Sequence, residues 1–560
     1  MIEVLLLSLF FALGMSGWGH LLYSCLLLER PVFPTSIFLG LIFASQIALT
    51  LHFFTPLSPV VTSALVLIGF LFFIWQNLKR PKIAFSVWFY LVAAGSFILI
   101  AGYGLDNNLY SDVVAYHFPT VEWIKNYKIV FGLANLHDRL GFNSIWHLTS
   151  SLSNPNLRWQ SSMDYASIVF LWVYLINVYY LPEKLRFLGW IGRGVAFLIW
   201  GKATFLINLG LPATDLPSTI CCLLFYEKIL TIFEKNKMAQ KDFVEIFLIY
   251  IFTFQLKLSQ IFLIFPFSVL IFSYRENIFI WVKGKKAKFL ALGFLMMFPW
   301  LLRSFFLSGC WLFPAAQSCF PKTPWSLPLA DVALVKFHVL SWARVQNLSL
   351  DAFSWVEWFP AWAQMQFLKF HIQFFVFSSL AAAFLLIYNK VRNRKQQVCS
   401  VPLMPAPFLL YVSIYVVLIL WFIQGPDPRF AMGSFIFLQA LIIYFICNQF
   451  ISLMRYKVYL KTCLVLILCV YLQDMLRISS SAFLKSPIWS DRFDESDRFT
   501  FKNKISMHGV AYKVPDLTKY TEGGCWLEKG FCANQERPFL AQIRIGSYLL
   551  FSTQKDSINE

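Results

Sequence analysis

Residues 403–423 read LMPAPFLLYVSIYVVLILWFI and contain no charged side chain. An α-helix rises about 1.5 Å per residue, so roughly 20 apolar residues cross the ~30 Å hydrocarbon core of a bilayer. Comparable apolar runs occur at 83–105, 162–181 and 429–450. The sequence therefore predicts a helical protein that spans a membrane.

The overall composition points the same way. Hydrophobic residues make up 58% of the 560 residues and charged residues 14%, whereas soluble domains contain roughly 45–50% and about 25%. Soluble globular proteins are therefore excluded as a class. The acidic Glu3 and the absence of an early Lys or Arg do not fit a signal peptide, so the first apolar run is expected to be a span. Length and hydropathy together predict about fourteen spans, near 3–27, 35–54, 60–77, 83–105, 162–181, 188–207, 213–231, 242–257, 259–273, 289–308, 371–389, 403–423, 430–450 and 458–475.

Basic residues concentrate in alternate connections between these spans. The clearest examples are 78–83, 274–289, 390–395 and 455–461. Because cytoplasmic loops carry an excess of Lys and Arg, these connections are assigned to the cytoplasmic side. This topology explains the net charge of +18, whereas a nucleic-acid partner would require the charge on one surface. No nucleic-acid partner is expected.

The opposite connections are long and become external. The predicted organisation is transmembrane helices at 1–104, an external loop at 105–161, transmembrane helices at 162–308, a second external loop at 309–370, transmembrane helices at 371–475 and an external C-terminal domain at 476–560. In the first loop, PTVEWIKNYK begins at Pro119 and is typical of an amphipathic helix at the membrane surface. Long loops of this kind usually carry function.

Four cysteines fall on the predicted external side. Cys310 and Cys319 lie close together in the chain, as do Cys525 and Cys532. Disulfides persist in oxidising compartments, so two short disulfide loops are expected, with four free thiols as the alternative.

Charged side chains gather near the predicted external ends of the spans. Such residues cost several kcal/mol unless they are paired or face a polar cavity. Their one-sided placement indicates an external site suited to a lipid-linked phosphate, although interfacial snorkelling or mutual ion pairing is the alternative. The residues are Asp164, Asp215, Lys257, Arg303, Asp427, Arg429 and Asp474.

The first external loop also carries a family resemblance. The stretch YSDVVAYHFPTVEWIKNYKIVFGLANLHDRLGFNSIWH at 110–147 resembles the corresponding loop of bacterial GT-C class membrane glycosyltransferases. It is most similar to an uncharacterised group of membrane proteins with the pattern GLANLH-x-RLGFNS. Further matches are LKLS at 256–259, RSFFLSG at 303–309, PDPRF at 426–430 and the GCW…C pair near the end.

The resemblance implies an all-α, GT-C-like polytopic fold in the bacterial inner membrane. It implies transfer of a sugar from a polyprenyl-phosphate donor to a cell-envelope glycan or lipid acceptor, with the active site facing the periplasm. The carboxylate role in the first loop falls on Asp112. The Asp-Asp or Asp-Glu adjacency frequent in the family is absent here, so Asp215, and then Asp138, are the candidates for a second carboxylate. The implied donor-phosphate ligands are Lys257, Arg303, Arg429 and Arg139, and the implied substrate contacts are Tyr116 and His117.

Several alternatives remain open at this stage. Asp112 has the position of a helix N-cap, and a histidine such as His117 beside aromatic residues is often structural. No ligand spacing typical of a metal site occurs, although some GT-C relatives use a divalent cation, Mg or Mn, through loop carboxylates.

Three other functions make different predictions. An O-antigen polymerase or ligase would have its indispensable Arg or His residues in the 309–370 loop. A lipid-linked glycan transporter or flippase would line a path to both sides of the membrane with charges. A scaffold protein would tolerate replacement of Asp112.

Overall fold

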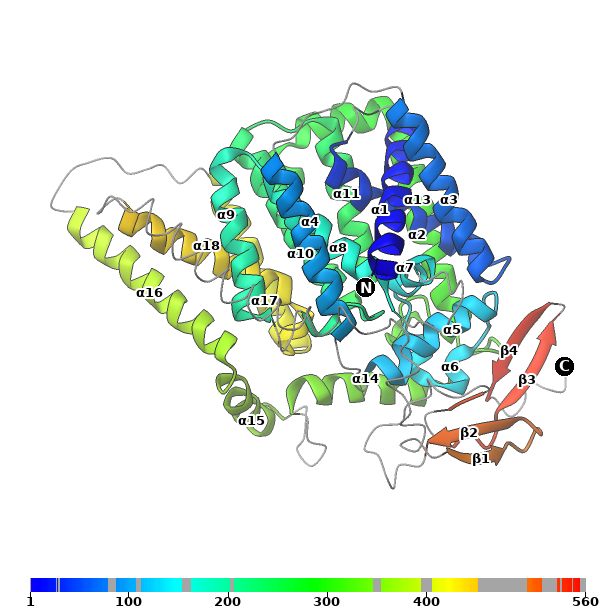
Figure 1. Ribbon diagram of the computed structural model, residues 1–560. Helices are drawn as coiled ribbons and strands as arrows, with labels where there is room; N and C mark the ends of the chain where they lie inside the picture. Colours follow the sequence, from blue (N-terminus) through cyan, green and yellow to red (C-terminus); the bar gives the residue numbers. More distant parts are fainter. Residues whose placement is uncertain are drawn as a thin grey trace.

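Long helices form most of the molecule, and short loop elements gather at one end of the helix bundle (Figure 1). The computed structural model describes residues 2–26, 28, 31–78, 87–106, 112–153, 163–201, 206–345, 354–393, 405–451, 501–515, 531–533, 536–545 and 547–553. The α-helices are α1 (Ile2–Cys25), α2 (Phe33–His52), α3 (Pro59–Leu78), α4 (Val87–Asp106), α5 (Phe118–Asn126), α6 (Leu133–Leu136), α7 (Ile145–Ser153), α8 (Tyr165–Asn177), α9 (Glu183–Gly194), α10 (Asp215–Lys235), α11 (Gln240–Leu256), α12 (Ile264–Ser273), α13 (Arg275–Ser308), α14 (Leu329–Arg344), α15 (Trp355–Phe367), α16 (Phe370–Asn393), α17 (Pro405–Gln424) and α18 (Met432–Ile451).

Short helical turns and four strands complete the described chain. The strands are β1 (Phe501–Ile505), β2 (Ala511–Pro515), β3 (Ala541–Ile545) and β4 (Tyr548–Ser552). The turns are η1 (Val113–His117), η2 (Asp138–Gly141), η3 (Val178–Tyr180), η4 (Val195–Ile199), η6 (Leu206–Asn208), η7 (Leu258–Leu263), η8 (Ala316–Ser318) and η9 (Pro428–Phe430).

The predicted helical membrane protein is confirmed in its general form. Six stretches of helix within the described residues are long and apolar enough to cross a membrane: Ile2–Cys25, Phe33–His52, Pro59–Leu78, Asp215–Lys235, Ala291–Ser308 and Phe370–Tyr388. A seventh candidate is the bent pair Leu258–Ser273 and Arg275–Lys283. Every predicted span inside the described residues overlaps a helix, whereas 458–475 lies outside them. The number of fourteen spans remains a prediction.

The basic segment 274–289 differs from the predicted loop. It forms the start of α13, which runs continuously from Arg275 to Ser308. The chain bends by 86° between the helical segments Leu258–Ser273 and Arg275–Lys283. Because Lys and Arg are good helix formers, a basic composition does not by itself end a helix.

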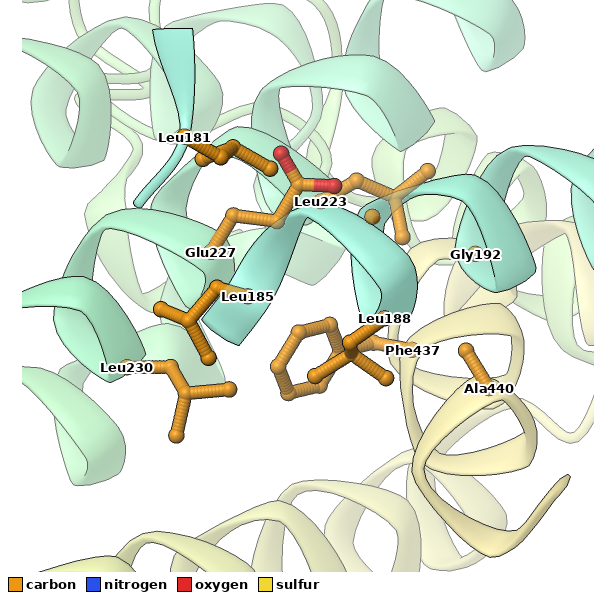
Figure 2. Close-up of a pocket in the computed structure, with 10 residues that line it drawn as sticks. Leu181, Leu185, Leu188, Gly192, Leu223, Glu227, Leu230, Phe437 and Ala440 are labelled. Carbon is orange, nitrogen blue, oxygen red and sulfur yellow. The ribbon is translucent and has the colours of Figure 1, made fainter. Parts of the chain in front are cut away.

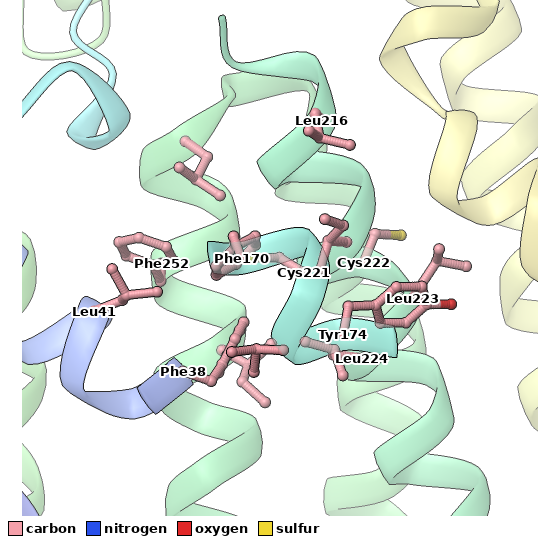
Figure 3. Packing of buried hydrophobic residues seen from close by; sticks show 14 of the residues in the cluster. Phe38, Leu41, Phe170, Tyr174, Leu216, Cys221, Cys222, Leu223, Leu224 and Phe252 are labelled. Carbon is pink, nitrogen blue, oxygen red and sulfur yellow. The ribbon is translucent and has the colours of Figure 1, made fainter. Parts of the chain in front are cut away.

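The bundle is held together by close side-chain packing. Figure 3 shows Phe38 of α2 and Phe170 of α8 near Cys221 of α10, and the two phenyl rings stack with centroids 5.0 Å apart. Helices α1 and α2 approach closely at Gly40, where an added Cβ would lie 1.7 Å from the carbonyl oxygen of Met15. In lipid, helix association depends on such packing, and small residues permit it.

The C-terminal strands pack against the 105–161 segment, which the sequence predicts to be an external loop. Strands β1 and β2 form one antiparallel pair, and β3 and β4 form another. The backbone of Phe131 bonds to Leu549 and Phe551 on β4, at 3.0 and 2.9 Å. Nδ2 of Asn135 donates to the carbonyl oxygens of Phe551 and Trp325, at 3.2 and 2.9 Å. The first loop is therefore fixed by residues more than 400 positions away.

Candidate functional site

Asp112 lies directly before the π-helical turn η1 but makes no side-chain capping bond to it. Instead, Oδ1 accepts a hydrogen bond from Nη1 of Arg139 at 2.9 Å. Oδ2 lies 3.6 Å from Nη1 of Arg429. The carboxylate is thus used in ion pairing between two guanidinium groups, and not as a helix cap.

Arg429 joins several carboxylates. It lies in η9, in the turn between α17 and α18. Its Nε and Nη2 lie 3.0 and 2.9 Å from Oδ2 of Asp427, whose Oδ1 accepts from the backbone N–H of Arg429 at 2.9 Å. Nη1 lies 4.0 Å from Oδ2 of Asp215. With Asp112, Arg429 therefore contacts three acidic side chains.

Asp215 and Lys257 form the next pair. Asp215 is the first residue of α10, where the helix dipole favours a negative charge. Lys257 follows the last residue of α11 and contacts Oδ1 of Asp215. Nζ of Lys257 also lies 4.5 Å from the ring centre of Phe430. These contacts hold the ends of α10 and α11 against η9.

The six residues form one network, here called the acid–base cluster: Asp112, Arg139, Asp215, Lys257, Asp427 and Arg429. Three side chains are acidic and three are basic, so their formal charges cancel. Burial alone would lower the pKa of Arg429, but the neighbouring Asp427 and Asp215 outweigh it and raise that pKa. Arg429 therefore remains a cation at neutral pH, and the cluster offers carboxylates next to fixed positive charge.

Tyr116 and His117 border the cluster. Their rings lie 4.1 Å apart, and the guanidinium of Arg139 lies 5.8 Å from the ring centre of Tyr116. Burial lowers the pKa of His117 to about 4, against the opposing effect of Asp112 and Asp215. Burial also raises the pKa of Tyr116. Near neutral pH both side chains are uncharged, so they can bind a ligand only through hydrogen bonds and ring contacts.

Arg303 is not part of the acid–base cluster. It is 1% exposed, and its Nη1 donates to Oδ1 of Asn143. Within the described residues, no carboxylate lies within ion-pairing distance of it. Asp138, next to Arg139 in η2, lies 3.5 Å from Nδ1 of His137. The structure thus brings together three of the four predicted phosphate ligands.

The other predicted residues have varied positions. Asp164 accepts hydrogen bonds from Ser153, Trp146 and the backbone of Ala166, as a buried cap of α8. Cys310 and Cys319 form a disulfide. Cys532 is also disulfide-bonded, whereas its predicted partner Cys525 lies outside the described residues, as does Asp474. The described part of the chain contains no group of three His, Cys, Asp or Glu residues placed to hold a metal ion.

Two neighbours of the site were not found from the sequence. Nε2 of His147 lies 2.9 Å from Nδ1 of His117, although 30 residues separate them. Lys369 precedes α16, and burial lowers its pKa while Asp427 opposes that shift. A lysine just before an apolar run was a usable signal for Lys369. His147 had none, because its spacing from His117 fits no motif.

An apolar cavity elsewhere in the bundle is distinct from this site. It has a volume of about 20 Å³ and is lined mainly by leucines of α9 and α10, together with Phe437 and Ala440 of α18 (Figure 2). Its one charged residue, Glu227, pairs with Arg193 at 2.6 Å. Roughly 18 Å of helix rise separates Glu227 from Asp215. The cavity therefore lies too far along α10 to serve the acid–base cluster.

Comparison with protein families gives one match. Residues 1–437 match a family described as a domain of unknown function, DUF8201. The chain belongs to this family. The DUF8201 region includes every residue of the acid–base cluster, whereas the described strands follow it. Comparisons with curated proteins and with solved structures give no match.

Proposed function

We propose that this protein is a membrane glycosyltransferase of the bacterial inner membrane, with its site on the periplasmic side. The donor is a sugar on a polyprenyl phosphate, and the acceptor is a hydroxyl of an envelope glycan or lipid. The main support is the geometry of Asp112, a carboxylate between two arginines at one end of a helix bundle. Its side chain is 29% exposed, whereas those of Asp215 and Asp427 are 12% and 8% exposed. Asp112 is thus the most accessible acid of the cluster.

In the proposed reaction, Asp112 takes the proton of the acceptor hydroxyl as its oxygen attacks the anomeric carbon. The bond from that carbon to the phosphate oxygen breaks, and the polyprenyl phosphate leaves with the electron pair. Arg429, Lys257 and Arg139 stabilise the leaving phosphate, since cations fixed in advance need little reorganisation. Asp215 and Asp427 hold Lys257 and Arg429 in position.

The alternative of a transporter is less well supported. The acid–base cluster joins loop residues and helix ends, and does not form a file of charges along the bundle. The two functions also differ in a simple requirement, because a transporter needs a sealed bilayer and a transferase does not.

The test is replacement of Asp112 by Asn in a deletion background. We expect sugar transfer to fall by about 10²–10⁴-fold, the usual contribution of a general base, with accumulation of lipid-linked sugar and loss of the corresponding envelope glycan. Glu183→Gln is the control, because Glu183 is an exposed carboxylate at the start of α9 and is not a member of the acid–base cluster. Unchanged glycans in Asp112→Asn at normal abundance would exclude the proposed base.

Purified protein in detergent micelles separates the two classes of function. A transferase moves labelled sugar from the lipid carrier to an added acceptor there, and Asp112→Asn does not. Failure of the wild type under conditions that preserve its fold would favour the transporter.

A further inference from the structure

The His117–His147 contact sets the proton positions of both rings. Both side chains are buried, 4% and 1% exposed. Their rings meet through one hydrogen bond of 2.9 Å, between Nδ1 of His117 and Nε2 of His147. Nδ1 of His147 is buried, and none of the described residues gives it a hydrogen-bond partner. Two neutral imidazoles joined in this way share one proton in the bond, so one ring donates and the other accepts.

Only two arrangements are possible for a neutral pair. If His117 donates from Nδ1, Nε2 of His147 accepts, and the remaining proton of His147 must sit on Nδ1. That N–H would be a buried donor without an acceptor, which is rare and unfavourable. If His147 donates from Nε2, its Nδ1 carries only a lone pair. A bare acceptor is tolerated better than an orphaned N–H.

The surroundings keep both rings neutral. Arg303 is close enough to His147 to act on it electrostatically, and its positive charge disfavours a protonated ring there. Burial lowers the pKa of both rings, so neither is charged near neutral pH. In the second arrangement His117 has its lone pair on Nδ1, directed at His147, and its proton on Nε2.

We propose that His147 is a positioning residue that holds His117 as the neutral Nε2–H tautomer, so that His117 offers an uncharged donor to a substrate oxygen beside Asp112. The second half of this statement rests on the proposed function. An uncharged donor suits this location because the cluster already holds three cations. A fourth positive charge would compete with the three cations for the carboxylates of the cluster. A neutral N–H binds a phosphate or hydroxyl oxygen without changing the net charge of the site.

The tautomer can be measured without any substrate. Full-length protein labelled with ¹⁵N-histidine is studied by solid-state ¹⁵N NMR in lipid bilayers at neutral pH, and the His117 signals are assigned by their loss in His117→Gln. We expect the wild type to show a protonated Nε2 and a bare Nδ1. His147→Gln should keep this pattern, because a glutamine side chain can place its N–H₂ where Nε2 of histidine stood. His147→Glu replaces the donor by a carboxylate, which can only accept, and should shift His117 towards the Nδ1–H form.

Two results would overturn the proposal. One is a protonated Nδ1 on His117 in the wild type. The other is an unchanged His117 signal in His147→Glu. If His147→Glu does not fold, the wild-type spectrum and the His147→Gln spectrum still decide the matter.

A kinetic comparison tests the substrate contact separately. His147→Glu and His117→Gln should reduce sugar transfer by a similar factor of about tenfold, equivalent to about 1.4 kcal/mol, while His147→Gln stays near the wild-type rate. Transfer by His147→Glu at the wild-type rate would overturn the contact. Absence of transfer in the wild type would refute the proposed function and leave the tautomer assignment standing.

Discussion

The contact of Lys257 with Asp215 gives the sharpest stability prediction. The two side chains are 17% and 12% exposed. Removing one partner of a fully buried pair costs about 3–5 kcal/mol, and an exposed pair contributes about 0.2–1 kcal/mol. At this intermediate burial, Lys257→Met should lower the free energy of unfolding by about 2 kcal/mol. The reason is that Asp215 then keeps only Arg429, at 4.0 Å.

Asp215→Asn should cost less. Lys257 keeps its contact with the Phe430 ring, 4.5 Å away, and Arg429 keeps Asp427 at 2.9 Å. We expect a loss of about 1 kcal/mol for this variant. The double variant should lose about 2 kcal/mol, and not the sum of about 3, because the second change removes a partner that is already missing. The coupling energy is then about 1 kcal/mol.

The measurement is a double-mutant cycle of equilibrium unfolding in mixed micelles, followed by tryptophan fluorescence. Lys369→Met is the matched control, since Lys369 lies near the same cluster but forms no ion pair within the described residues. Its effect should add to that of Asp215→Asn within about 0.3–0.5 kcal/mol. If the effects of Lys257→Met and Asp215→Asn on the free energy of unfolding also add within about 0.3–0.5 kcal/mol, the two residues are not a coupled ion pair.

Three further predictions follow from other parts of the structure. Burial lowers the pKa of His117 from 6.5 to about 4 in the folded state, so below pH 6.5 the unfolded chain binds more protons than the folded chain. The free energy of unfolding should therefore fall by up to about 3 kcal/mol as the pH drops towards 4. His117→Gln should reduce this pH dependence in unfolding experiments. Asn135→Leu leaves the carbonyl groups of Phe551 on β4 and of Trp325 without their donor, at a cost of about 1–3 kcal/mol. It should speed the proteolytic release of a C-terminal tag. The control is Asn126→Leu, at an exposed position. The Cys310–Cys319 disulfide closes a loop with a sequence separation of 9, so its loss should cost about 2–3 kcal/mol; alkylation of both thiols in intact cells without reductant would contradict the external assignment of this loop.

The sequence could predict the helices because their signal is local. An uncharged run such as 403–423 needs no partner to be recognised as a candidate span, and α17 begins and ends within two residues of it. It was also predictable that these charged residues share one end of the bundle. The basic connections orient alternate spans, and this orientation gives each charged residue a predicted depth. Asp112, Asp215, Lys257 and Arg429 meet at that end, as their common predicted depth suggested.

The remaining features depend on contacts between distant residues. Depth along a helix does not say which way a side chain points, so Arg303 was grouped with Lys257 although it packs against Asn143. Strand β4 pairs through Leu550 with Phe131, hundreds of residues earlier. The His117–His147 pair joins η1 to the buried helix α7 and fits no sequence spacing. Such features follow from packing, which a single sequence does not display.

The pairing of β4 with Phe131 bears on how the protein is made. During translation, all of the described helices leave the ribosome before β4 does. The nascent chain can therefore insert its helices into the bilayer while the loop that carries Arg139 still lacks its final support. Folding of this end of the molecule should therefore follow membrane insertion. A prematurely terminated chain should reach the membrane without the contacts that hold the loop carrying Arg139.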